Sequence, residues 1–312
     1  MFQWPQYELG VCYYPEQWEE SLWRDDLKRM KSVGIGTVRV AEFCWALFEP
    51  AEGEFHFELF DRFLSYCQEE GMKVILGTPS ATPPAWLTEA YPEVLNALPD
   101  KTLLRHGARR HYNYNSPVYQ RFCSRIAEEM AKHFASHPAV IGWQIDNELN
   151  CETDEFHSES DDLAFREFLK RHYTTLENLN RAWGTVVWSG VYTSWDQIFT
   201  PRPVLNAGHN PHYILDYYRF ISDSCIRFAR MQAEILRKYL PDSNNSMLPV
   251  IMSESSNKEE TISMTERDIL YKILFELRSN VNDMRREMTS LKKQIEDVQV
   301  SGQPVATPLG TT

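Results

Sequence analysis

The chain has 312 residues, of which 43% are hydrophobic, and its formal net charge is −12 at pH 7. This acidic balance excludes nucleic-acid binding by bulk charge and disfavours docking on anionic lipid. No run of about 18 apolar residues occurs, so no membrane span is predicted. The first ten residues lack a secretory pattern, and the six cysteines are scattered without a C-x-x-C pair. We therefore expect a cytoplasmic protein with reduced thiols, no metal site and no cofactor.

The composition changes near Pro241. After that residue only Tyr271 and Phe275 are aromatic, and no cysteine occurs. The change coincides with a polar run, PDSNNS, that is typical of a linker. We therefore predict a first domain over 1–241 and a linker over 242–262.

The first domain alternates strand and helix patterns. Strands are predicted at 9–14, 37–45, 73–78 and 140–148, with amphipathic helices between them. Gly34 and Gly71 follow the first two helices as expected at helix ends, and Ser116 followed by Pro117 predicts the start of another. Further helical patterns lie at about 161–172 and 214–240.

Apolar strands that alternate with amphipathic helices indicate a parallel α/β fold, with functional residues in the loops after the strands. A doubly wound sheet and a TIM barrel both fit this alternation. No glycine-rich phosphate loop follows the first strand, which disfavours dinucleotide binding. The segment 79–115 is long and rich in Pro, Trp, Tyr and Arg, and loops of that length are usually functional.

Glu148 is the strongest catalytic candidate. It follows Asn147 at the end of the fourth predicted strand, where barrel enzymes place their chemistry. Apolar surroundings near Trp143 would raise its pKa, as a general acid requires. The alternative is a strand-end glutamate that caps the next helix or pairs with an arginine.

Six motifs in order carry a family resemblance. They are GVCYYPEQW (10–18), VRVAEFCW (38–45), PSATPPAWL (79–87), RRHY (109–112), WQIDNE (143–148) and LNRAWGT (179–185). With them, residues 8–241 resemble the N-terminal part of the family 42 glycoside hydrolases, mostly bacterial β-galactosidases. The resemblance implies a (β/α)8 TIM barrel and a retaining mechanism.

The resemblance also implies site residues. Glu148 falls on the acid/base position, Asn147 on the residue that bonds the sugar 2-hydroxyl, and Arg110 on a substrate-binding arginine of the galactose subsite. Trp86 and Trp183 either stack on the sugar or pack in the core. Some members carry a zinc cluster of cysteines near the acid/base. Here only Cys151 stands in that segment, so we expect no such metal site.

A retaining enzyme needs a nucleophile, and the family's nucleophile is a glutamate at the end of strand seven. Residues 1–241 account for about four βα units of the eight in a TIM barrel. The fold expected is thus a partial barrel, and the nucleophile stays unknown. Glu254, in LPVIMSE, is the nearest candidate, although an exposed linker is the place we expect for it.

The C-terminal segment has a different pattern. Apolar residues recur at 270, 274, 277, 281, 284, 288, 291, 295 and 298, with alternating spacings of four and three. This heptad seam predicts a coiled-coil-like helix over 263–299, homo-oligomers through 270–298, and a disordered end over 300–312. The alternative is one amphipathic helix that packs on the partial barrel. Residues from about 249 to 300 are also similar to the linker after the ATPase module of bacterial enhancer-binding regulators, which suggests that two unrelated coding segments were joined.

Two functions follow. The first is a β-galactosidase-like retaining hydrolase of terminal β-D-galactosides, impaired because the strand-seven nucleophile is missing. The second is a noncatalytic half-barrel remnant fused to an oligomerising helix.

Overall fold

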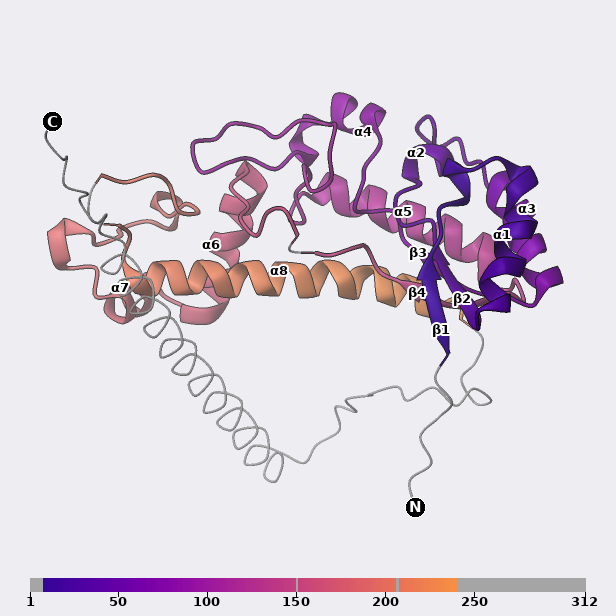
Figure 1. Ribbon diagram of the computed structural model, residues 1–312. Coiled ribbons are helices and arrows are strands. Elements are labelled where there is room, and N and C mark those ends of the chain that lie inside the picture. Colours follow the sequence, from indigo (N-terminus) through magenta and orange to yellow (C-terminus); the bar gives the residue numbers. More distant parts are fainter. Residues whose placement is uncertain (1–7, 150, 206–207, 241–312) are drawn as a thin grey trace, which may run out of the picture. The chain divides into compact units, whose positions relative to one another are not determined.

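The computed structural model describes residues 8–149, 151–205 and 208–240 (Figure 1). All of them belong to one of the two units into which the chain divides, Met1–Ser246. The predicted linker, coiled-coil helix and C-terminal end lie outside the described residues, as does Glu254. These expectations therefore stay predictions.

Four parallel strands form one sheet. They are β1 (Leu9–Cys12), β2 (Ile35–Val40), β3 (Lys73–Gly77) and β4 (Val140–Gln144), hydrogen-bonded in the order β1-β2-β3-β4. The parallel α/β prediction is confirmed. In the common doubly wound sheets β1 lies inside the sheet, whereas successive barrel strands are neighbours. The strand order thus fits the barrel alternative, with about four βα units.

Helices α1 (Glu20–Ser32), α3 (Glu58–Glu70) and α5 (Pro117–Phe134) connect the strands. Gly34 and Gly71 have φ of +88° and +65°, a left-handed conformation that ends a helix and suits glycine. Ser116 Oγ accepts a hydrogen bond from the Tyr119 backbone N–H, so it caps α5. These predicted helix boundaries are confirmed.

All four predicted strands end too late, and the second and fourth do so by the most. β2 ends at Val40, Ala41 has φ of +82°, and a short helix α2 (Trp45–Phe48) follows. β4 ends at Gln144, and Asp146 and Glu148 have φ of +56° and +50°. A strand cannot continue through residues in the left-handed conformation, so each strand ends before the apolar run of the sequence does.

The second half of the unit is helical. It contains α6 (Glu159–Tyr173), α7 (Leu176–Trp183) and α8 (Pro211–Arg237). One more short helix, α4 (Ala85–Ala90), lies earlier in the chain, in the long loop after β3. α8 packs along α5 and also contacts α6 and α7 (Figure 1). The rings of Tyr119 on α5 and Phe228 on α8 stack with centroids 6.0 Å apart. Short 3-10 turns lie at Pro15–Gln17, Pro92–Val94, Val187–Ser189 and Trp195–Gln197.

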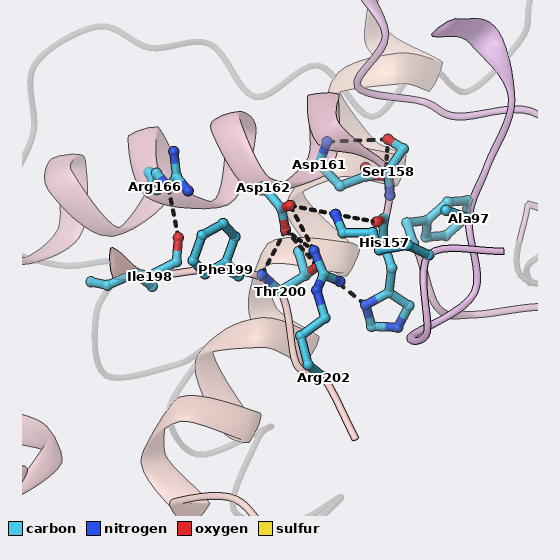
Figure 2. A network of polar contacts seen from close by, with 12 residues as sticks. Ala97, His157, Ser158, Asp161, Asp162, Arg166, Ile198, Phe199, Thr200 and Arg202 are labelled. Carbon is cyan, nitrogen blue, oxygen red and sulfur yellow. Dashed lines mark hydrogen bonds and ion pairs between the residues drawn. The ribbon is translucent and has the colours of Figure 1, made fainter. Parts of the chain in front are cut away.

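A buried carboxylate ties the long loop to α6. Asp162 accepts from Arg202 Nη2 at 2.6 Å and from the Thr200 backbone N–H at 2.9 Å (Figure 2). It also accepts from Lys101 Nζ at 2.6 Å. Lys101 belongs to the loop after β3, and Thr200 and Arg202 to the segment before α8. Asp162 thus ties the loop that carries Arg109 and Arg110 to α6 and to the segment before α8.

Candidate active site

A buried aspartate shapes the turn after β4. The backbone N–H of Asp146 donates to Thr78 Oγ1 at 2.7 Å. Its carboxylate is fully buried and accepts from Ser80 Oγ at 2.7 Å and from the Asn147 backbone N–H at 2.6 Å. Thr78 and Ser80 follow β3, so Asp146 joins the carboxyl ends of two neighbouring strands. Asp146 was not among the predicted site residues, although an acid that follows an apolar strand was a signal.

Glu148 lies at this turn with 56% of its side chain exposed. Arg109 Nη1 donates to its Oε2 at 2.9 Å, and Arg109 also pairs with Glu152. The hydrogen bonds from Arg109 and from the Cys151 thiol lower the pKa of Glu148. The predicted rise in its pKa is therefore wrong, because the carboxylate is open to solvent and paired. The alternative prediction, an arginine pair, is confirmed.

Arg110 is almost completely buried beneath the same turn. Its Nη1 donates to Tyr114 Oη at 2.7 Å and to Asp146 Oδ1 at 3.1 Å, and also to the Tyr112 hydroxyl. Nε and Nη2 have no partner among the described residues. Because Asp146 Oδ1 also binds the Asn147 backbone, Arg110 and Asn147 share one carboxylate. The structure thus brings Arg110, Asn147 and Glu148 together.

Asn147 is held through its side chain as well. Its Oδ1 accepts from Gln144 Nε2 at 3.1 Å, and Gln144 Oε1 accepts from Arg39 Nη1 at 2.7 Å. Arg39 in turn pairs with Glu42, with Nη2 and Oε1 2.9 Å apart. Gln144, Arg39 and Glu42 were not among the predicted site residues. The signal was polar side chains inside the apolar motifs VRVAEFCW and WQIDNE.

The two tryptophans take packing roles. Trp183 is buried, and its indole N–H donates to Asp216 Oδ2 at 2.8 Å. Trp86 is half-buried, donates to the Glu49 backbone oxygen at 2.8 Å, and meets the Phe122 ring edge-on. These contacts fit the packing alternative for both residues.

A shallow cavity of about 390 Å³ adjoins Arg109. Phe43 and Ala46, the segment 82–84 and the segment 106–109 line it. The Arg109 guanidinium lies 5.6 Å from the centroid of the Phe43 ring. The cavity is thus next to the cation that binds Glu148.

Within the residues that the structure describes, no three His, Cys, Asp or Glu side chains are grouped to hold a metal ion. No helix in that part of the chain is long and apolar enough to cross a membrane. No disulfide joins cysteines within the described residues, and Cys151 is half-buried with its Sγ 3.7 Å from Arg109 Nη2.

Successive parallel βα units with an Asn–Glu pair after β4 define part of a glycoside hydrolase barrel. The family Glyco_hydro_42, described as beta-galactosidase, matches residues 12–293. The chain belongs to this family. The prediction of family 42 membership is thus confirmed.

Individual relatives agree. The β-galactosidase BgaA of a Thermus species is 44% identical over 234 residues, which is 75% of this chain and 36% of that protein. The solved β-galactosidase of the psychrophilic Marinomonas ef1 has a TM-score of 0.72 at 43% identity, and covers 75% of this chain and 36% of its own. That of Halorubrum lacusprofundi has a TM-score of 0.73 at 40% identity, with 76% and 35% covered.

The matches differ in extent. The chain spans about a third of the length of these relatives. The family match extends to residue 293, across the predicted linker and coiled-coil segment, whereas the Thermus alignment covers 75% of the chain. The separate origin that we predict for the C-terminal segment stays a prediction.

Proposed function

We propose that this chain carries the acid/base half of a retaining β-galactosidase site for terminal β-D-galactosides. Glu148 is the acid/base residue, and Arg110 and Asn147 bind the sugar. One observation supports this most directly. An exposed glutamate follows Asn147 at the carboxyl end of β4, in a chain of family 42.

Proton transfer requires Glu148 to leave Arg109. Paired with Arg109, the carboxylate is ionised at neutral pH, whereas a general acid must be protonated. A substrate that displaces Arg109 and covers Glu148 removes the hydrogen bond that lowers its pKa and adds desolvation, which raises it. The cavity beside Arg109 provides space for the leaving group on this side.

The second carboxylate of a retaining site stands about 5–5.5 Å from the first. Near Glu148, Asp146 is buried and bound by Arg110, and Glu152 shares Arg109. Burial prevents Asp146 from attacking a sugar, and we assign Glu152 no part in the attack. We therefore propose that the chain alone turns over galactosides very slowly, because loss of a nucleophile removes the covalent step.

The test is hydrolysis of an aryl β-galactoside by the purified chain, beside Glu148→Gln and the matched control Glu152→Gln. Galactose binding is measured on the same three proteins. We expect galactose to bind the chain and both variants, with turnover near the Glu148→Gln background. Absence of galactose binding would contradict the proposal, and fast turnover by the chain would contradict its impairment.

The second candidate is a noncatalytic remnant that oligomerises. Among the described strands, β1 and β4 each pair on one side only, and such edges need covering. The heptad seam over 270–298 would join copies of the chain. The absence of disulfides within the described residues suits a cytoplasmic protein. Sedimentation of the full chain and of a chain ending at residue 240 tests this. A monomeric full chain that binds no galactose would contradict both candidates.

A further inference from the structure

A chain of hydrogen bonds leads from β2 to Asn147, and its first member can only donate. Arg39 Nη1 lies 2.7 Å from Gln144 Oε1. A guanidinium has no acceptor, so Gln144 must present its oxygen to Arg39. The amide nitrogen of Gln144 must then face the opposite way.

The contacts of the Gln144 amide nitrogen require the same orientation of the side chain. Its Nε2 lies 2.8 Å from the Asp146 backbone oxygen and 3.1 Å from Asn147 Oδ1. A backbone carbonyl only accepts, so a nitrogen must stand there. Asn147 therefore presents its oxygen to Gln144. Its Nδ2 faces away, and no described residue accepts a hydrogen bond from it.

Arg39 is itself fixed. The fully buried Glu42 accepts from Arg39 Nη2 at 2.9 Å and Nε at 3.1 Å, and from the Tyr14 hydroxyl at 3.2 Å. Gly77 makes room for this carboxylate, because a Cβ there would stand 2.5 Å from the Cβ of Glu42. The guanidinium thus has one orientation, and the direction of every amide after it follows.

We propose that Gln144, oriented by Arg39 and Glu42, is a positioning residue that makes Asn147 a hydrogen-bond donor toward the 2-position of the sugar. This rests on the proposed function, which assigns Asn147 to that position. The site then selects a 2-substituent that accepts a hydrogen bond. A galactoside with a 2-hydroxyl fits, whereas galactosamine, whose 2-ammonium only donates, does not.

The test compares the affinities of the full chain for galactose, galactosamine and 6-deoxygalactose. We expect the wild type to prefer galactose over ammonium-form galactosamine about tenfold. Gln144→Met frees the Asn147 amide to rotate, and Gln144→Glu forces rotation because it replaces the donor with an oxygen. Both variants should reduce the preference at least about threefold, with the galactose to 6-deoxygalactose ratio unchanged.

A merely structural Gln144 would weaken all three sugars alike, which would overturn the proposal. A change in Gln144→Glu without one in Gln144→Met would assign the effect to the added charge, and would overturn it too. Gln120→Met is the matched control, since Gln120 Nε2 donates to the Tyr114 backbone oxygen.

A measurement without sugar keeps this inference separate from the proposed function. In the free wild type, NMR should show slow hydrogen exchange at the Gln144 side-chain amide and faster exchange at that of Asn147. In Gln144→Glu the Asn147 amide should become protected, because its nitrogen then donates to the new carboxylate. An Asn147 amide that exchanges identically in both proteins would overturn the inference. Absence of galactose binding would overturn only the proposed function.

Discussion

At the end of β4, two neighbouring arginines each bind a nearby carboxylate, and one of these pairs is buried whereas the other is exposed. The side chains of Arg110 and Asp146 are 2% and 0% exposed, whereas those of Arg109 and Glu148 are 30% and 56% exposed. The buried pair is also bound by tyrosines and by Ser80, so it shapes the turn. The open pair is held by fewer contacts and is weakened by solvent. Burial, and not residue type, separates the pair that shapes the turn from the pair that we propose for proton transfer.

The largest expected difference between the pairs is in stability. Asp146→Ala leaves the Arg110 charge buried without a counterion, which typically costs about 3–5 kcal/mol of unfolding free energy. Glu148→Ala should leave the urea midpoint near that of the wild type, because its pair is exposed. Similar midpoints for the two variants would remove the distinction.

The buried His157 should make the stability of the protein depend on pH. Burial, and next the charge of Arg202, lower the pKa of His157 to about 4. The unfolded chain binds this proton first, so the stabilisation is complete above about pH 6.5 and falls by up to about 3 kcal/mol as the pH drops to 4. His157→Gln should flatten this part of the unfolding profile relative to the wild type. The matched variant at the exposed His133, His133→Gln, should keep it. An unchanged slope in His157→Gln would refute the assignment.

Removal of the open cation should free Glu148. In Arg109→Met the carboxylate loses its main hydrogen bond, so the pKa of Glu148 should rise toward its ordinary value. A carbon-13 NMR titration of the Glu148 carboxyl measures this. The exposed Arg121, which lies over Tyr91 and Phe122, supplies the control Arg121→Met. Equal pKa values in all three proteins would show that the Arg109 pair is absent in solution.

Salt should give the smallest effect. At 1 M NaCl the Debye length is about 3 Å, so the attraction between exposed Arg109 and Glu148 is screened. The pKa of Glu148 should rise, by less than in Arg109→Met, while the unfolding difference between wild type and Asp146→Ala should persist. A salt-independent Glu148 pKa would indicate a pair more enclosed than the structure shows.

The sequence allowed much of this fold to be predicted, because its signals are local. Gly71 and Ser116 mark helix ends through their own backbone and side-chain chemistry, and the apolar runs mark the strands. The position of Glu148 after the fourth strand was predicted for the same reason.

The electrostatics of the site were not predictable in this way. Arg109 and Arg110 are adjacent in sequence, and only the packing of the loop after β3 decides which one is buried. The left-handed turn at Asp146 and Glu148 depends on Thr78 and Ser80, far away in the chain. Such contacts leave no periodic pattern in the sequence, so the predicted direction of the Glu148 pKa shift was wrong.

A chimera tests the central claim, that Glu148 is the acid/base residue of a half-site, most directly. Residues 8–240 of this chain would replace the aligned part of the Thermus β-galactosidase, which is the longer protein. We expect β-galactoside hydrolysis that falls by about 10²–10⁴-fold in Glu148→Gln and stays near the parent chimera in Glu152→Gln. The loss should be smaller for substrates with activated leaving groups. A folded, active chimera in which Glu148→Gln hydrolyses lactose as fast as its parent would contradict the account.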